Sequence, residues 1–291
     1  MKNFIITIIT ICAIFCGWFP CIAASEKIPV FVSILPQKYF AEKIGGEHID
    51  VSVMVEPGGN PHNYEPKPKQ MAVLSKAKIY FAVGVTFEEI WLEKFAGINK
   101  EMAIIHIDDG VEKISMKADH HEGEKKEDHG TKDPHIWLSP PLVKIQAKNI
   151  FNALAAADPE HSRDYEANYN RFITELTDLD TEIRNILSKK GKNKQFMVFH
   201  PAWGYFADAY GLEQIPVEIE GKTPKPAELG HLIKHAKEHG IKVIFVQPQF
   251  SAKSAEVIAK EIGGKIAFAD PLSPDWADNL RQMAEKFVSH N

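Results

Sequence analysis

Residues 158–190 have the sequence DPEHSRDYEANYNRFITELTDLDTEIRNILSKK, which predicts one long amphipathic helix. Asp158 can cap the first free backbone N–H groups, and Pro159 suits the first helical turn, where no N–H partner is needed. Apolar and aromatic residues then form a stripe along one face: Tyr165, Tyr169, Phe172, Leu176, Leu179, Ile183 and Ile186. A helix of about thirty residues is about 45 Å long. We therefore expect it to link two lobes of one chain, in preference to a coiled-coil dimerisation helix.

The composition is that of a globular protein with room for two domains. The chain has 291 residues, of which 44% are hydrophobic, and a formal net charge of -5. Nucleic-acid binding requires a basic surface, so the negative net charge argues against a nucleic-acid partner. Because the long helix is expected to pack within its own chain, we expect a monomer.

Residues 1–24 have the features of a secretory signal peptide. Lys2 precedes an apolar run, and the small residues Ala23 and Ala24 fit a cleavage site. An uncleaved membrane anchor is the alternative, but Pro20 and the short apolar core fit it poorly. We therefore expect a soluble periplasmic protein.

The cysteines also lie in this leader, at Cys12, Cys16 and Cys21. The predicted mature protein thus has neither thiol nor disulfide and depends on its apolar core for stability. A lipid anchor on Cys21 is a further alternative, and the bulky residues before Cys21 argue against it.

Apolar, β-branched runs of strand length alternate with helical patterns in both halves of the chain. We expect strands at 28–35, 49–55, 79–83 and 103–107, and again at 195–199, 215–218, 242–246 and 265–269. A helix is expected at 39–44, after the first strand. This alternation predicts two α/β lobes with parallel sheets, the first at 25–157 and the second at 191–291, joined by the helix at 158–190.

Residues 118–131, ADHHEGEKKEDHGT, interrupt the first lobe with a run that has no large apolar residue. Such a segment cannot bury a core, so we expect a mobile surface loop. Its histidines are His120, His121 and His129. They favour a low-affinity collector of zinc, and a merely solvated charged loop is the alternative.

Four side chains that can bind a metal lie at or just after the carboxyl ends of predicted strands: His62, His135, His200 and Asp270. Ligands of open α/β sheets bind at that edge, so we expect these residues to meet in one cleft between the lobes. Imidazole nitrogens and a carboxylate suit Zn²⁺, whereas Ca²⁺ and Mg²⁺ prefer oxygen ligands. A single histidine beside a proline is more often a surface residue, and only the concurrence of four favours a site.

The motifs around these positions resemble a known family. GGNPHNYEPKP, DPHIWLSP, FHPAWGYFADAYGL, VQPQFSAKSAEVIAKEIG and FADPL are similar to motifs of the cluster A-I solute-binding proteins, which deliver transition metals to ABC importers, and most similar to the zinc-uptake branch. The resemblance covers essentially the whole mature chain. It implies two (β/α)4 lobes joined by a long backbone helix, with the metal between them and an ABC permease as partner.

Position by position, the resemblance places the family's metal ligands on His62, His135, His200 and Asp270. The manganese branch usually has Glu at the third position, so His200 favours zinc. Two features depart from the family pattern: Pro61 stands where some zinc members have Glu, and the second lobe has no disulfide. Asp270 therefore has three open roles, which are to bind the metal, to bind a ligand residue, or to leave room for water.

The sequence allows two further interpretations. A zinc hydrolase would need a general base such as Glu65, but Pro61 and Pro66 exclude the two-histidine helix of a zinc protease. A second set of histidines recurs every four residues at His231, His235 and His239, where nearby lysines favour a solvated helix face. The sequence thus predicts a non-enzymatic, zinc-binding periplasmic protein, with a manganese carrier as the alternative. Because ligation requires neutral imidazole, metal affinity should fall below about pH 6.

Overall fold

The structure, a computed structural model, describes residues 26–116, 132–189, 194–218, 222 and 224–289. The predicted signal peptide and the predicted loop with His120, His121 and His129 lie outside the described residues. Among the helices of the described part, none has both the length and the apolar character that crossing a membrane requires.

The first lobe contains a four-stranded parallel sheet with the order β2-β1-β3-β4. Its strands are β1 (Ile28–Val32), β2 (Ile49–Val53), β3 (Ile79–Ala82) and β4 (Ala103–His106). Its helices are α1 (Leu35–Gly45), α2 (Pro68–Leu74), α3 (Thr86–Ile98) and α4 (Pro140–Ala157). Val30 pairs with Val51 on one side and with Ile79 on the other, so β-branched residues line the sheet centre.

The second lobe repeats this topology with the order β6-β5-β7-β8, again entirely parallel. Its strands are β5 (Gln195–Val198), β6 (Glu213–Pro216), β7 (Val243–Val246) and β8 (Lys265–Phe268). Its helices are α6 (Gly204–Tyr210), α7 (Pro226–Glu238), α8 (Lys253–Glu261) and α9 (Trp276–Ser289). In each sheet the strand order reverses beside the first strand, which is where ligands of open α/β sheets bind.

The predicted fold class is confirmed, and all eight predicted strands are present. One strand, β6, begins two positions before the expected segment at 215–218. The helix expected at 39–44 begins earlier, at Leu35, because Pro36 occupies its first turn and fits there without a backbone donor.

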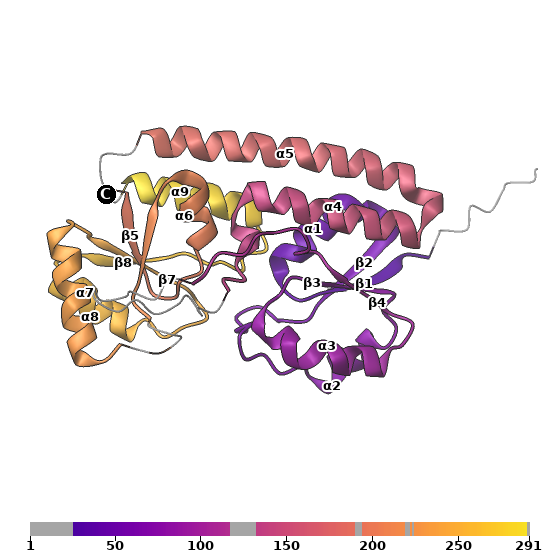
Figure 1. The fold of residues 1–291 in the computed structure, drawn as a ribbon, viewed down its shortest axis with the longest axis horizontal. Coiled ribbons are helices and arrows are strands. Elements are labelled where there is room, and N and C mark those ends of the chain that lie inside the picture. Colours follow the sequence, from indigo (N-terminus) through magenta and orange to yellow (C-terminus); the bar gives the residue numbers. More distant parts are fainter. Residues whose placement is uncertain (1–25, 117–131, 190–193, 219–221, 223, 290–291) are drawn as a thin grey trace, which may run out of the picture.

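The long helix α5 (Ser162–Ser188) extends over both lobes (Figure 1). Its buried face consists of the predicted stripe positions Tyr165, Phe172, Leu176, Leu179 and Ile183. It packs on α1 and α4 of the first lobe and on α9 of the second. A single helix therefore supports both halves, as the pattern predicts.

The predicted start of this helix was wrong. Residues Pro159–His161 form a turn of 3₁₀-helix, and the α-helix begins only at Ser162. Asp158 Oδ2 accepts hydrogen bonds from His161 Nδ1 at 2.6 Å and from the Tyr165 hydroxyl at 2.7 Å. These side-chain partners compete with the expected capping of backbone N–H groups.

One apolar core runs through both lobes. It includes the first sheet, the buried faces of α5 and α9, and residues such as Phe196 and Phe245 on one face of the second sheet. A smaller cluster lies between the other face of that sheet and helices α7 and α8. The shared core predicts limited movement between the lobes.

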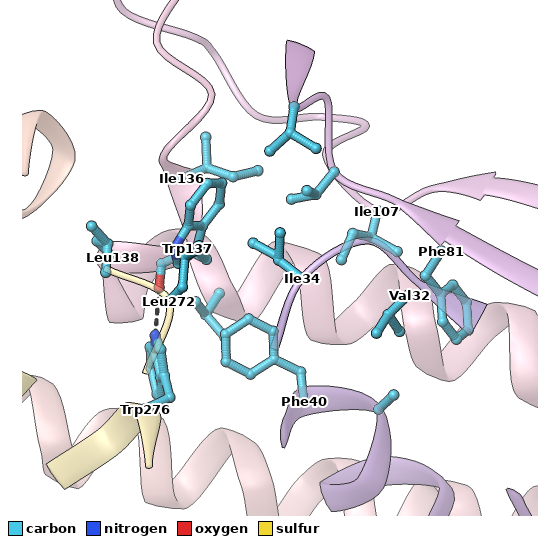
Figure 2. Close-up of a cluster of buried hydrophobic side chains, with 14 of the residues drawn as sticks. Val32, Ile34, Phe40, Phe81, Ile107, Ile136, Trp137, Leu138, Leu272 and Trp276 are labelled. Atoms are coloured by element: carbon cyan, nitrogen blue, oxygen red, sulfur yellow. Dashed lines mark hydrogen bonds between the residues drawn. The ribbon is translucent and has the colours of Figure 1, made fainter. Parts of the chain in front are cut away.

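Trp276 is the clearest link between the two halves of the chain. It begins α9, and its ring packs edge-on against Phe40 of α1 with centroids 4.9 Å apart. Its Nε1 donates to the backbone oxygen of Trp137 at 2.7 Å (Figure 2). In return, Trp137 Nε1 donates to the Pro271 carbonyl at 2.8 Å. The segment around Trp137 and the segment around Pro271 are therefore held together.

Candidate metal centre

Three histidines meet where the two lobes face each other. His62 lies in the loop after β2, His135 precedes the short turn Ile136–Leu138, and His200 lies two positions after the end of β5. His62 Nε2 lies 3.1 Å from His200 Nε2, and the candidate ligand atoms of all three residues lie within 4.8 Å of one another. Ligands of tetrahedral zinc at about 2.0–2.1 Å are about 3.3–3.5 Å apart. Small movements of the three imidazoles would therefore bring their nitrogens to the spacing of zinc ligands.

Hydrogen bonds fix the backbone that presents each ring. His62 N donates to Asn60 Oδ1 at 2.9 Å, and His135 N donates to Asp133 Oδ1 at 2.9 Å. The Gln247 side chain binds His200 on both sides, since Gln247 Oε1 accepts from its N–H and Gln247 Nε2 donates to its carbonyl. Rigid backbone placement of this kind pre-organises a binding site.

Each ring also has a partner at Nδ1. Asp133 Oδ1 lies 2.7 Å from His135 Nδ1, Glu218 Oε2 lies 2.6 Å from His200 Nδ1, and Thr86 Oγ1 lies 3.1 Å from His62 Nδ1. An ionised carboxylate can only accept, so Asp133 and Glu218 keep the proton on Nδ1 and leave Nε2 with a free lone pair. Thr86, Asp133 and Glu218 were not predicted from the sequence. Asp133 had a signal, because it stands two positions before a proposed ligand.

Burial favours the uncharged form of His62 and His200. Only 2% of His135 and 5% of His200 is exposed, and His62 is partly buried. Burial, together with the neighbouring His135 and His200, lowers the pKa of His62 to about 3. Burial also lowers the pKa of His200, although Glu218 acts in the opposite direction. Neutral imidazole is the form that binds metals, so His62 and His200 can bind without first losing a proton.

The rings line a cavity of about 10 Å³. This is about the space that one water molecule needs. The residues around it are Asn60, Pro61, His62, His135, Trp137, His200, Gln249, Phe250, Pro271 and Leu272. Phe250 lies parallel to the His200 ring, with centroids 4.5 Å apart. Gln249 and Phe250 were also missed, because nothing in their residue types alone indicates a metal site.

Asp270 does not belong to the group of three histidines. Its Oδ1 accepts hydrogen bonds from Gln249 Nε2 at 2.8 Å and from Leu272 N at 2.9 Å. Direct metal binding by Asp270 stays a prediction.

The remaining candidates lie elsewhere. Glu65 is exposed and is not among the residues that line the cavity, so it gives no support to a hydrolytic site. On α7, the rings of His235 and His239 stack with centroids 4.3 Å apart. Within the described residues, no group of three or more side chains able to hold a metal includes them.

The fold and the three-imidazole centre together define a class: a two-lobed α/β protein that can hold one metal ion between its lobes. The family model described as "Zinc-uptake complex component A periplasmic" matches residues 30–290. The chain belongs to this family, which confirms the resemblance seen in its motifs.

Relatives and solved structures agree with this assignment. The chain is 33% identical over 255 residues to the "High-affinity zinc uptake system protein ZnuA" of Bacillus subtilis, covering 85% of this chain and 79% of that protein. It is 30% identical to the "Zinc-binding protein AdcA" of Streptococcus pyogenes, covering 94% of this chain but only 56% of that longer protein. A structure titled "Crystal structure of ZnuA" superposes with a TM-score of 0.85 at 43% identity, covering 91% of this chain and 99% of that one. A second, of a "138-173 ZnuA deletion mutant plus zinc bound", also has a TM-score of 0.85, at 44% identity, covering 91% of this chain and 98% of that one.

Proposed function

We propose that the protein captures Zn²⁺ in the periplasm and delivers it to the permease of an ABC importer. The observation that carries this proposal is the convergence of His62, His135 and His200 from two lobes on one small cavity. Three neutral nitrogen ligands favour zinc over manganese, which prefers oxygen ligands. In this proposal the signal peptide at 1–24 directs export, and the mature protein acts as a monomer.

The size of the cavity supports a binding protein over an enzyme. The space of about 10 Å³ beside the three rings has room for an ion or a water molecule. A hydrolase would also need a base beside the metal, and Glu65 is exposed. We therefore propose that the ion is the cargo.

The arrangement of ligands suggests how the ion is released. His62 and His135 come from the first lobe and His200 from the second, so a small separation of the lobes on docking to the permease would remove one of the three imidazoles. Zinc held by two imidazoles is bound far more weakly, which favours transfer. We also propose that His120, His121 and His129 collect zinc at low affinity. Deletion of residues 118–131 should then slow zinc capture without changing the equilibrium affinity.

The proposal is tested by metal competition on purified mature protein. After exposure to equimolar Zn²⁺ and Mn²⁺, mass spectrometry should find about one zinc per chain, and the His62→Ala and His200→Ala variants should retain none. His106→Ala, which changes an exposed histidine, serves as the matched control and should retain zinc. Retention of manganese by the wild-type protein would mean that the protein carries manganese. Retention of zinc by both the His62→Ala and the His200→Ala variants would mean that zinc binds elsewhere.

Delivery needs a test in cells. A strain that lacks its own zinc-binding component but keeps the permease should recover uptake of radioactive zinc when it expresses this protein. The His200→Ala variant should not restore uptake. Equal zinc uptake with the wild-type protein and with the His200→Ala variant would mean that transport does not depend on this metal centre.

A further inference from the structure

Gln249 has one satisfied and one unsatisfied side-chain atom beside the metal centre. Its Nε2 donates to Asp270 Oδ1 at 2.8 Å. Its Oε1 is buried and has no hydrogen-bond partner among the described residues. Gln249 also lines the cavity that His62, His135 and His200 share. Buried carbonyl oxygens without a hydrogen-bond partner are rare and cost free energy. We therefore expect Gln249 Oε1 to accept a hydrogen bond from a bound group.

Asp270 determines how the Gln249 amide is oriented. A carboxylate accepts hydrogen bonds and donates none, so the NH₂ group of Gln249 must face Asp270 and the carbonyl oxygen must point elsewhere. Asp270 is itself held in place, because the same Oδ1 accepts from Leu272 N at 2.9 Å. The orientation of the Gln249 amide is therefore set by its partner.

The three histidines leave one position of a tetrahedral zinc ion open. The cavity of about 10 Å³ has the size of one water molecule, and a metal-bound water is a strong hydrogen-bond donor. The Gln249 carbonyl oxygen supplies the acceptor that such a water needs, and the water supplies the donor that this oxygen lacks.

We propose that Gln249 and Asp270 form a positioning pair, in which Gln249 Oε1 holds the water that completes the coordination of the bound ion and Asp270 orients Gln249. This inference rests on the proposed function, since it assigns the fourth position of the same site. Asp270 then acts through Gln249 and does not touch the metal. A water is exchanged more readily than a carboxylate, so such a fourth ligand suits a protein that must release its cargo.

Two substitutions separate this arrangement from direct binding by Asp270. Gln249→Met keeps the size of the side chain and removes its carbonyl, so zinc affinity should fall about tenfold, as for other residues that orient a ligand. Asp270→Asn keeps an oxygen that accepts from Gln249 and Leu272, so affinity should stay within about threefold of wild type. Gln282→Met is the matched control, because Gln282 forms a similar pair with Asp278 on the exposed face of α9.

A spectroscopic readout tests for the water itself. Protein loaded with Co²⁺ in ¹⁷O-enriched water should give an ¹⁷O coupling in electron–nuclear double resonance for wild type, Asp270→Asn and Gln282→Met. The coupling should be changed or absent in Gln249→Met. If that variant does not fold, Gln249→Asn replaces it, since the shorter amide cannot reach the same position and should show the same change.

Other outcomes overturn the proposal in distinguishable ways. A loss of tenfold or more in Asp270→Asn, with Gln249→Met like wild type, would make Asp270 a direct ligand. Absence of an ¹⁷O coupling in Co²⁺-loaded wild type would exclude the water. Failure of wild type to bind Zn²⁺ or Co²⁺ at all would refute the proposed function and not the assignment of Gln249 alone.

Discussion

His62 Nε2 and His200 Nε2 lie 3.1 Å apart, although 138 positions separate the two residues in the chain. Because Glu218 keeps the proton of His200 on Nδ1, this contact is a hydrogen bond when His62 carries its proton on Nε2 and donates it to the His200 lone pair. When a cation binds, the His62 proton lies on Nδ1, facing Thr86 Oγ1, and both Nε2 lone pairs face the ion. The ion thus replaces the direct contact between the two lobes.

This relationship predicts that zinc stabilises the whole protein. At a free zinc concentration of about 100 times Kd, the free energy of unfolding should rise by about 2.7 kcal/mol. For a chain of this size that corresponds to a rise in Tm of about 5–10 °C. Calorimetry with and without a chelator measures the shift.

The His200→Ala variant should show almost none of this stabilisation, and His106→Ala should show all of it. An equal rise in Tm for His200→Ala would mean that zinc stabilises the protein from another site.

The carboxylates behind the rings should control metal affinity without touching the ion. In Glu218→Gln, the amide can donate its N–H to His200 Nδ1, which favours the tautomer with the proton on Nε2 and blocks metal binding. We expect zinc affinity about 10–100-fold weaker by competition with a chromogenic chelator. Asp133→Asn should behave in the same way through His135.

Glu213→Gln provides the control for Glu218→Gln. Glu213 lies on β6 in the same lobe and is exposed, with Gln195 Nε2 at 2.8 Å from its carboxylate. The Glu213→Gln variant should bind zinc with the same affinity as the wild-type protein. If Glu218→Gln also matches wild type, the carboxylate does not determine the tautomer of His200.

Acid should weaken the metal-free protein through His62. Burial lowers the pKa of His62 from 6.5 to about 3, so between these values the unfolded chain binds a proton that the folded chain does not. Stability therefore rises with pH over this window and is lost as pH falls through it. Urea unfolding of metal-free wild type and of His62→Asn at several pH values should show a smaller pH dependence in the variant. Equal slopes for both proteins would mean that His62 does not titrate with a lowered pKa.

The same shift bears on the expectation from sequence that affinity falls below about pH 6, which stays a prediction. That value assumed ordinary imidazoles, whereas burial lowers the pKa of both His62 and His200. Competition from protons at these two rings should begin at lower pH. Burial could not be read from residues that flank prolines in apparent loops.

Much of the fold was predictable because periodicity is a local signal. The buried stripe of α5 and the eight strands follow from repeats of apolar residues. The three histidines could be grouped because the ends of parallel strands meet at one edge of a sheet. The start of α5 was not predictable, since a side-chain network around Asp158 competes with the cap.

The partners of the metal ligands were not predictable for a different reason. Thr86 reaches His62 across 24 positions and Glu218 reaches His200 across 18. Contacts of this kind depend on how helices and loops lie in space, and neither a Thr at the start of a helix nor a Glu after a strand has a pattern that reveals its partner. The same holds for Gln249, whose partner Asp270 is 21 positions away.

The interlobe link through Trp276 should be essential for stability. Trp276 is 1% exposed and packs against Phe40, so Trp276→Ala creates a large cavity in the shared core and should cost about 3–5 kcal/mol in the free energy of unfolding. Denaturation with urea measures this cost. Phe268→Ala is the matched control, because Phe268 is 60% exposed and its loss should change stability by less than about 0.5 kcal/mol.

A milder variant connects this link to the metal centre. Trp276→Phe keeps most of the packing but removes the N–H that binds the Trp137 carbonyl, which should cost about 1–3 kcal/mol. Trp137 and Pro271 both line the cavity and are joined by their own hydrogen bond. Loosening of Trp137 should therefore also increase the rate at which zinc dissociates, measured by transfer to an excess of chelator. A dissociation rate equal to that of wild type, despite reduced stability, would show that Trp276 supports the fold without influencing the ion.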